Sequence, residues 1–190
     1  MVPEAPLEQT EHGFLPAGDG WFVLNAREAE WRVWEGRGKW PRLEGARPTF
    51  PQLGLGLTVL DRGEPLSMYH CERDQEDFLV LHGEALAIVE GEERPLRQWD
   101  LLHCPAGTKH AIVGAGTGPC VVFAVGAREK TMYRTPDGRL SPTKDWGAYP
   151  VDEAALRHGA GLEQETSDKS AANPTFPDRV STHYGGWLPD

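Results

Sequence analysis

The stretch Tyr69–Gly83, which reads YHCERDQEDFLVLHG, and the later stretch Pro105–His110, which reads PAGTKH, carry the pattern that decides both the fold and the site. Successive side chains of an extended strand point to opposite faces, so His70 and Glu72 are expected on one side of the same strand. The Pro-x-Gly turn of the second stretch is expected to deliver His110 from another strand. Imidazole and carboxylate groups that converge in this way are typical ligands of a divalent cation. The sequence therefore predicts a metal site formed by His70, Glu72, Glu76 and His110.

The overall composition fits one folded domain with many turns. The chain has 190 residues, of which 39% are hydrophobic and 25% are charged, a length that allows one domain with a sizeable core. Its 22 glycines and 16 prolines favour short strands joined by turns over long helices. The formal net charge of −10 argues against nucleic acid as a partner, because binding to phosphates needs a cationic surface. The longest basic cluster, residues 94–97, holds only two arginines.

The cysteines and the first residues of the chain predict its compartment. Cys71, Cys104 and Cys120 are odd in number and show no Cys-x-x-Cys spacing, which favours reduced, buried thiols over a disulfide framework or a structural zinc site. The first ten residues lack the apolar core of a signal peptide. No apolar run approaches the ~20 residues that a membrane helix needs. These observations predict a cytoplasmic protein without a membrane partner.

The chain divides into three parts by composition. Residues 1–19 are interpreted as a flexible or loosely docked N-terminal arm, residues 20–128 as a β-barrel, and residues 129–190 as a C-terminal extension. Turn signals recur about every 8–12 residues in the middle part, as expected of a β-sandwich or a closed barrel. The predicted fold class is therefore all-β, with a mostly irregular extension that packs either on its own barrel or on a partner subunit.

Short sequence patterns predict individual elements within these parts. In the extension, Asp152 is a candidate N-cap, and Gly159 a stop, for a short helix over residues 152–158. Short apolar runs predict strands at 21–24, 31–34, 52–60, 68–72, 77–81, 85–89, 94–96, 100–104, 110–113 and 121–125.

With these patterns in view, the chain resembles the cupin superfamily, which consists of small double-stranded β-helix (jelly-roll) barrels. The first cupin motif runs Gly, five spacers, His-x-His, three or four spacers, Glu, six spacers, Gly. The chain reproduces its second part with His70, Glu72, Glu76 and Gly83, whereas Gly63 stands one residue too early. Both motifs in order, within a turn-rich acidic chain, make the resemblance specific, and the strand pattern extends it over residues 52–126.

The second cupin motif runs Gly, five spacers, Pro-x-Gly, two spacers, His, three spacers, Asn. Pro105, Gly107 and His110 match this motif, while Trp99 and Gly114 stand where Gly and Asn are usual. The most important departure, however, lies in the first motif, where Glu72 takes the position at which the family most often has a second histidine.

Glu72 leaves two interpretations of the metal site open. With four nitrogen and oxygen ligands the site would suit one zinc, iron, manganese or nickel ion, and two ionised glutamates would neutralise its charge. If Glu72 stands back, His70, Glu76 and His110 form the two-histidine, one-carboxylate set associated with non-haem iron and open coordination positions. In that case Glu72 becomes a candidate acid or base that faces the substrate.

Three further residues are candidates for the site by their place in the predicted strands. Met68 shares the face of His70 and Phe78 that of Glu76, which makes both candidate pocket residues. His103, just before the Pro-x-Gly turn, is a second candidate for moving a proton.

The resemblance implies function in general terms only. It implies a metal-dependent enzyme that acts on a small polar or carbonyl substrate in the mouth of the barrel, as a dioxygenase, isomerase or lyase. The alternative is a non-catalytic cupin module that binds a small molecule or a metal. Fold alone does not choose between them. A homodimer is expected as well, because cupin barrels commonly pair through an outer sheet face.

Overall fold

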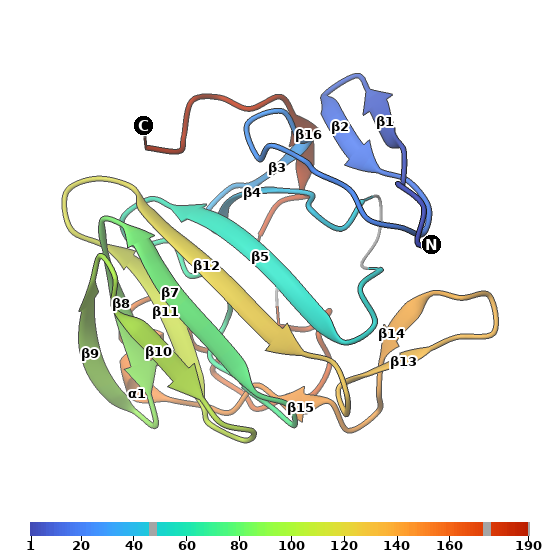
Figure 1. Cartoon of the computed structure of the whole chain (residues 1–190). Helices are drawn as coiled ribbons and strands as arrows, with labels where there is room; N and C mark the ends of the chain where they lie inside the picture. Colours follow the sequence, from blue (N-terminus) through green and yellow to red (C-terminus); the bar gives the residue numbers. More distant parts are fainter. Residues whose placement is uncertain (46–48, 173–175, 190) are drawn as a thin grey trace.

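The structure is a computed structural model that describes residues 1–45, 49–172 and 176–189. It consists mainly of antiparallel β-strands that form two facing layers, with the extension wrapped around one end and one side (Figure 1). This arrangement confirms the predicted all-β jelly-roll barrel. Among the described residues, no helix combines the length and the apolar character needed to cross a membrane.

The first layer is a large sheet that contains the glutamate of the site. In order across the sheet its strands are β10 (Leu101–Cys104), β7 (Glu76–His82), β12 (Cys120–Ala127), β5 (Leu53–Leu60), β4 (Gly38–Pro41), β3 (Trp31–Trp34) and β16 (Val180–Thr182). Every second residue of β5, β7 and β12 faces the interior, because side chains alternate along a strand. The sequence therefore sets which residues line the barrel as soon as the register is fixed.

The second layer contains both histidines. Strands β11 (His110–Ala115), β8 (Glu84–Val89) and β9 (Glu92–Arg97) form its sheet. The segment that leads to β6 (Cys71–Glu72) lies along the other edge of β11, through antiparallel bridges between Pro65 and Val113 and between His70 and His110. The predicted strand 68–72 is thus regular over β6 alone, and β6 pairs with β15 (Gly147–Ala148) of the extension.

The barrel core lies between the two layers. It is lined by apolar side chains from both sheets, namely Leu60, Phe78, Val80, Ala85, Cys104, Ile112, Cys120 and Val122. All of these side chains are almost fully buried. Their burial provides the main driving force for closing the barrel, at roughly 25 cal/mol per Å² of apolar surface. The three cysteines are free thiols, and two of them belong to this core.

The N-terminal residues, which were predicted to be a flexible or loosely docked arm, form a hairpin that contacts the rest of the chain. Strands β1 (Leu7–Thr10) and β2 (Gly13–Pro16) pair as a hairpin, and Leu15 is buried. The Thr10 hydroxyl donates a hydrogen bond of 2.9 Å to Glu30, a buried carboxylate that also pairs with Arg42 at 2.5 Å. This contact between distant segments explains why the N-terminal residues are docked, and the composition of residues 1–19 does not reveal it.

Two of the predicted N-terminal strands have different outcomes. The run 31–34 forms β3, and Trp31 is fully buried beneath Tyr184 and Trp187, with ring centroids 5.4 Å and 5.1 Å away. The run 21–24 forms no strand; Trp21 makes an isolated bridge to Glu4 and stays half exposed. The run 31–34 lies between β4 and β16 in the large sheet, whereas the run 21–24 has no neighbouring strand among the described residues.

The C-terminal extension contacts the chain's own barrel. Strands β13 (Met132–Arg134) and β14 (Leu140–Pro142) form a hairpin, and β16 joins the edge of the large sheet. The short helix α1 (Glu153–Arg157) confirms the helix predicted over residues 152–158. Asp152 is its N-cap, since its carboxylate accepts a hydrogen bond of 2.9 Å from the Ala155 N–H.

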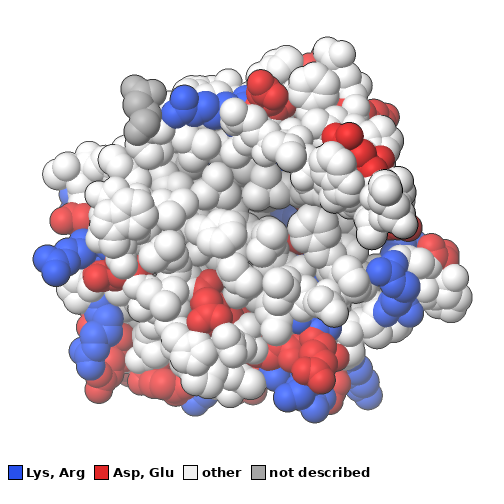
Figure 2. Space-filling model, in the orientation of Figure 1, with Lys and Arg blue, Asp and Glu red and all other residues white. Residues whose placement is uncertain are grey.

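The outer face of the large sheet carries little charge. Figure 2 shows a largely uncharged area over β5 and β12, with an acidic group in its lower part and most charged residues around its margin. Exposed apolar side chains on or beside this face include Leu53, Trp99 and Leu101.

Candidate metal centre

The two histidines meet because they stand directly opposite each other across two adjacent segments. The His70 N–H donates to the His110 carbonyl at 3.0 Å, and the His110 N–H donates to the His70 carbonyl at 2.8 Å. Directly paired residues place their side chains on the same face, so the ring centroids lie 4.7 Å apart. Both side chains are buried.

Glu76 completes the group from the opposite layer. As the first residue of β7, it points into the barrel and places Oε2 3.3 Å from His70 Nε2 and 3.3 Å from His110 Nε2. The ligand atoms of His70, Glu76 and His110 all lie within 4.8 Å of one another. The motif spacing predicted this convergence, and the structure confirms that the three side chains come together.

Hydrogen bonds at Nδ1 of His70 and His110 determine which ring nitrogen of each histidine carries a lone pair. His70 Nδ1 lies 2.9 Å from the Met68 carbonyl, and His110 Nδ1 lies 3.0 Å from the Thr108 carbonyl. A carbonyl can only accept, so both Nδ1 atoms carry hydrogen. In the neutral rings each Nε2 then presents a lone pair toward the Glu76 carboxylate, an arrangement that is common behind metal-ligating histidines.

Either a proton or a metal ion can satisfy the buried atoms that face one another. Glu76 Oε2 and His110 Nε2 are buried side-chain atoms without a hydrogen-bond partner among the described residues. Leaving such atoms unsatisfied costs free energy, and two lone pairs aimed at a carboxylate also repel it. A divalent ion with nitrogen and oxygen ligands satisfies all three side chains at once, so the residues fit the metal that the motifs imply.

Protons compete with a metal for the same position. Burial acts to lower the pKa of His110, but its contacts with Cys104 and Glu76 outweigh burial and raise the pKa to about 9. Glu76 also raises the pKa of His70 against the effect of burial, and the two histidines hold the pKa of Glu76 far below its usual range. The group therefore attracts positive charge, and a metal ion that binds there must displace protons.

Glu72 lies beside this group and not within it. Its Oε1 is 4.0 Å from His70 Nε2 and 3.6 Å from the ammonium of Lys169, a residue of the C-terminal extension. Burial, together with the neighbouring charge of Glu76, raises the pKa of Glu72 above its ordinary value. The predicted ligand therefore stands at the edge of the metal centre, as a carboxyl group that can take up a proton more readily than an exposed one.

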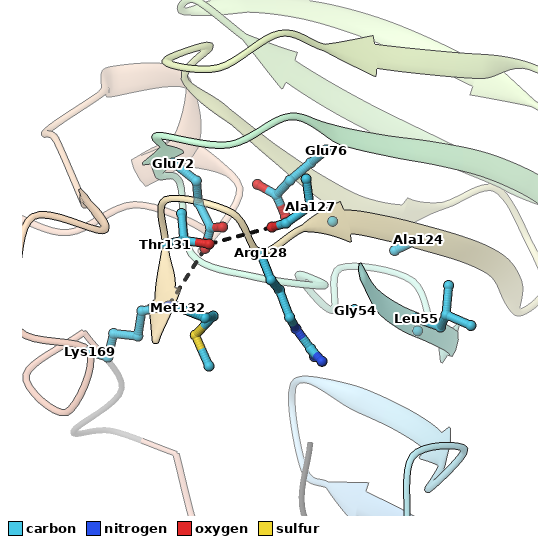
Figure 3. Close-up of a pocket in the computed structure, with 12 residues that line it drawn as sticks. Gly54, Leu55, Glu72, Glu76, Ala124, Ala127, Arg128, Thr131, Met132 and Lys169 are labelled. Atoms are coloured by element: carbon cyan, nitrogen blue, oxygen red, sulfur yellow. Dashed lines mark hydrogen bonds and ion pairs between the residues drawn. The ribbon is translucent and has the colours of Figure 1, made fainter. Parts of the chain in front are cut away.

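A pocket of about 330 Å³ opens next to the two glutamates. Figure 3 shows Glu72 and Glu76 projecting into the same space, while Arg128 points away from them. The Arg128 guanidinium forms two hydrogen bonds to Glu44, of 2.7 Å and 2.9 Å, at the margin of the pocket. The remaining lining residues are mostly small or apolar and include Gly54, Leu55, Gly56, Ala124, Gly126, Ala127, Thr131, Met132 and Lys169.

His103 lies on the outside of the barrel, contrary to its interpretation as a catalytic candidate. In the register of β10 and β7, His103 stands opposite Asp77, while Cys104 stands opposite Glu76. Glu76 faces inward, so Asp77 and His103 face outward, and His103 Nδ1 forms an exposed contact of 2.6 Å with Asp77 Oδ1. A shift of one residue in the register would have reversed this outcome.

The two residues predicted to line the pocket lie in the packed interior instead. Phe78 belongs to the barrel core and places its ring 5.2 Å from that of His110. Met68 is buried in a cluster with Trp146 and Tyr149 of the extension. Neither belongs to the lining of the pocket beside Glu76. Both share the face of a ligand, as expected, but neighbouring side chains cover them.

Several residues that line the pocket come from outside the motifs, in segments that carry no local sequence signal. Arg128, Thr131 and Lys169 reach the pocket from the segment after the last barrel strand and from the end of the extension. Cys104 faces the interior beside His110, as one of the buried thiols that the sequence predicts. An inventory of charged residues in the extension would have included Lys169, but only packing assigns it to the pocket.

Comparisons with known proteins agree with the fold. Residues 56–126 match the family model described as the cupin domain. A search of curated proteins gave no significant match. The matched range contains the proposed ligands, strands from both layers of the barrel and no part of the C-terminal extension.

Solved structures of cupins are similar to this chain at low sequence identity. A sugar phosphate isomerase of the cupin superfamily from Silicibacter pomeroyi is 22% identical, with a TM-score of 0.51 over 70% of this chain and 98% of that one. An RmlC-like cupin from Shewanella frigidimarina is 20% identical, with a TM-score of 0.42 over 50% of this chain and 79% of that one. A cupin 2 conserved barrel domain protein from Salinispora arenicola is 23% identical, with a TM-score of 0.37 over 41% and 64%.

Proposed function

Because this chain is a member of the cupin superfamily through residues 56–126, we propose that it is a divalent-metal-dependent enzyme. Its substrate is a small polar molecule with a carbonyl or hydroxyl oxygen, which binds in the pocket beside Glu76. One observation carries the proposal: two imidazole nitrogens and one carboxylate oxygen face a common point next to a pocket, and two of these atoms are buried without a partner among the described residues.

The donor set limits which metal would be held. His70, Glu76 and His110 supply two imidazoles and one carboxylate, which suits iron, zinc, manganese or nickel. With three protein ligands, coordination positions remain for a substrate oxygen or for water. Such an ion supplies Lewis-acid polarisation of a bound oxygen or, in the case of iron, redox chemistry.

The surrounding residues orient the substrate and handle its protons. Glu72 borders the same pocket as Glu76, and its raised pKa suits a group that accepts and returns a proton. The small residues Gly54, Gly56 and Gly126 leave room for a substrate against the inner face of the large sheet. Phe78 and the rest of the barrel core fill the interior behind the histidines, so a substrate would approach from the side of the pocket.

A phosphorylated substrate is not part of the proposal. The similar protein from Silicibacter pomeroyi is described as a sugar phosphate isomerase, but 22% identity supports a common fold alone. The pocket contains two cationic side chains, Arg128 and Lys169, and each has a carboxylate beside it, Glu44 and Glu72 respectively. These pairs offset the positive charge that a phosphate group needs.

Metal analysis of the purified protein tests the proposal directly. The chain is purified without oxygen, its metal content is measured, and carbonyl and hydroxyl compounds are screened for turnover. We expect about one divalent ion per chain in the wild type and none in His110→Ala. His103→Ala is the matched control, because it removes an imidazole from the outer face and should keep the metal.

The same preparation separates the enzyme from a non-catalytic binding module. A screened compound that raises the melting temperature of the metal-loaded protein without being converted would favour the binding module. A metal-free wild type that is as stable as the metal-treated protein would contradict the proposed function altogether.

A further inference from the structure

The carboxylate of Glu72 stands between two competing positive groups. On one side is the proposed cation position bounded by His70, Glu76 and His110; on the other is the ammonium of Lys169. The Glu72 side chain is only 17% exposed, so it interacts with these groups more than with water. Which group it contacts decides whether the metal has three or four protein ligands.

The backbone of Glu72 is fixed by the extension. Glu72 pairs with Gly147 of β15, and the Arg73 N–H donates to the Trp146 carbonyl at 2.9 Å. The two backbones approach so closely that a Cβ atom at Gly147 would lie 2.0 Å from the Cys71 carbonyl oxygen. The position of Glu72 therefore depends on residues 146–148 as well as on the barrel.

Lys169 is also held in place, by contacts on either side of its ammonium. Its Nζ lies 3.7 Å from the ring centroid of Trp146, a favourable cation–π distance. Trp146 is buried and donates from its indole N–H to the Ser167 carbonyl at 3.0 Å, which ties the ring to the loop that carries Lys169. In the same loop, Asp168 accepts hydrogen bonds of 2.8 Å and 2.7 Å from the backbone and the hydroxyl of Ser170. A turn that is held by these hydrogen bonds therefore places the Lys169 ammonium beside Glu72.

From this arrangement we propose that Lys169 is a positioning residue that holds Glu72 away from the metal. The inference rests on the metal centre proposed above and deepens it. With Glu72 retained by Lys169, a bound metal would be held by two histidines and one carboxylate of the protein. Glu72 is then available to exchange protons with a substrate. Without the ammonium, Glu72 turns toward the cation and becomes a fourth ligand.

Cobalt(II) alone is a suitable probe of the ligand number, because its visible absorption depends on the ligands that surround it. Wild type, Glu72→Gln, Lys169→Met and the double variant are titrated with cobalt, with Lys169→Gln as a second replacement. Lys144→Met is the matched control, since Lys144 is an exposed lysine of the same extension. Thermal unfolding of each variant verifies that it is folded.

The proposal predicts a distinct pattern across these variants. Glu72→Gln keeps the wild-type cobalt spectrum. Lys169→Met and Lys169→Gln change the spectrum and bind cobalt about twofold to fivefold more tightly, as expected for the loss of one partly exposed ion pair. The double variant returns to the wild-type spectrum and shows no gain over Glu72→Gln. Lys144→Met behaves as wild type.

Three results would overturn the inference. A changed spectrum in Glu72→Gln alone means that Glu72 is already a ligand. An unchanged spectrum in both Lys169 variants means that Lys169 does not hold it back. A gain in affinity that persists in the double variant means that Lys169 acts through its charge at a distance. Failure of the wild type to bind cobalt, by contrast, refutes the metal centre itself.

Discussion

The metal centre and the Glu72–Lys169 side of the pocket lie next to each other but are built in different ways. The first rests on barrel segments, and each histidine ring is oriented by the carbonyl of the residue two positions before it. The second depends on the extension, which pairs with β6 and supplies Lys169. The comparison shows that local spacing can encode a ligand group, whereas the environment of that group depends on packing between distant segments.

Replacing the two glutamates one at a time should give the largest contrast between these regions. We expect Glu76→Gln to weaken cobalt or zinc affinity by about 100-fold or more, since it removes the carboxylate that both Nε2 atoms face. Glu72→Gln should cost less than about tenfold, because it removes a nearby charge but no ligand. Isothermal titration measures both values. Equal losses of metal affinity in the two variants would contradict the assignment of Glu76 as a ligand and Glu72 as its neighbour.

Asp74 joins the barrel to the start of the extension, so its removal should destabilise the protein. Its buried carboxylate accepts hydrogen bonds of 2.8 Å from the Lys130 N–H, the Thr131 N–H and the Thr131 hydroxyl. We expect Asp74→Ala to lower the free energy of unfolding by about 2–3 kcal/mol, because buried donors lose a charged partner. Urea unfolding measures the loss. A change below about 0.5 kcal/mol would show that this junction contributes little.

The same carboxylate predicts how stability depends on pH. Burial acts to raise the pKa of Asp74, but the hydrogen bonds from Lys130 and Thr131 outweigh it and lower the pKa below its ordinary value of 3.8. A carboxyl group with a lower pKa in the folded state contributes stability above its unfolded pKa and loses it as pH falls through the folded pKa.

Acid unfolding should therefore be less steep in Asp74→Asn than in the wild type below pH about 4. The measurement is the free energy of unfolding between neutral pH and the acid transition, with Asp145→Asn, an exposed aspartate of the extension, as the control. Parallel curves for wild type and Asp74→Asn would contradict the assignment.

Loss of the helix cap in the extension should have a smaller effect. Asp152→Ala removes the side chain that accepts from the Ala155 N–H, and we expect a loss of about 1 kcal/mol in the free energy of unfolding. Asp152→Asn, which keeps an acceptor, should recover most of it. If both variants lose the same free energy of unfolding, Asp152 stabilises the helix through its charge and not through the capping hydrogen bond.

The expected homodimer remains a prediction, and the largely uncharged outer face of the large sheet is where we would test it. Leu101→Glu places a charge on a side chain that is 65% exposed, so it should change the free energy of unfolding by no more than about 0.5 kcal/mol. Sedimentation at micromolar concentration should show a dimer for the wild type and a monomer for the variant. A monomeric wild type would contradict the prediction.

The sequence by itself determined the β-barrel, the short helix and the convergence of His70, Glu76 and His110. The strands and the helix follow from short-range rules: side chains alternate along a strand, turn residues separate the strands, and Asp152 caps a helix. The convergence of the three ligands joins segments that are distant in the chain, and it was predictable because both motifs together resemble those of a known fold.

The tertiary structure alone decided which neighbours the metal centre has. It placed His103 outside the barrel, covered Met68 and Phe78, and brought Lys169 to Glu72. These outcomes depend on strand register and on contacts between distant segments, and a shift of one residue reverses the face on which a side chain lies. Composition and local pattern contain no information about that choice, because it is made by the packing of the whole chain.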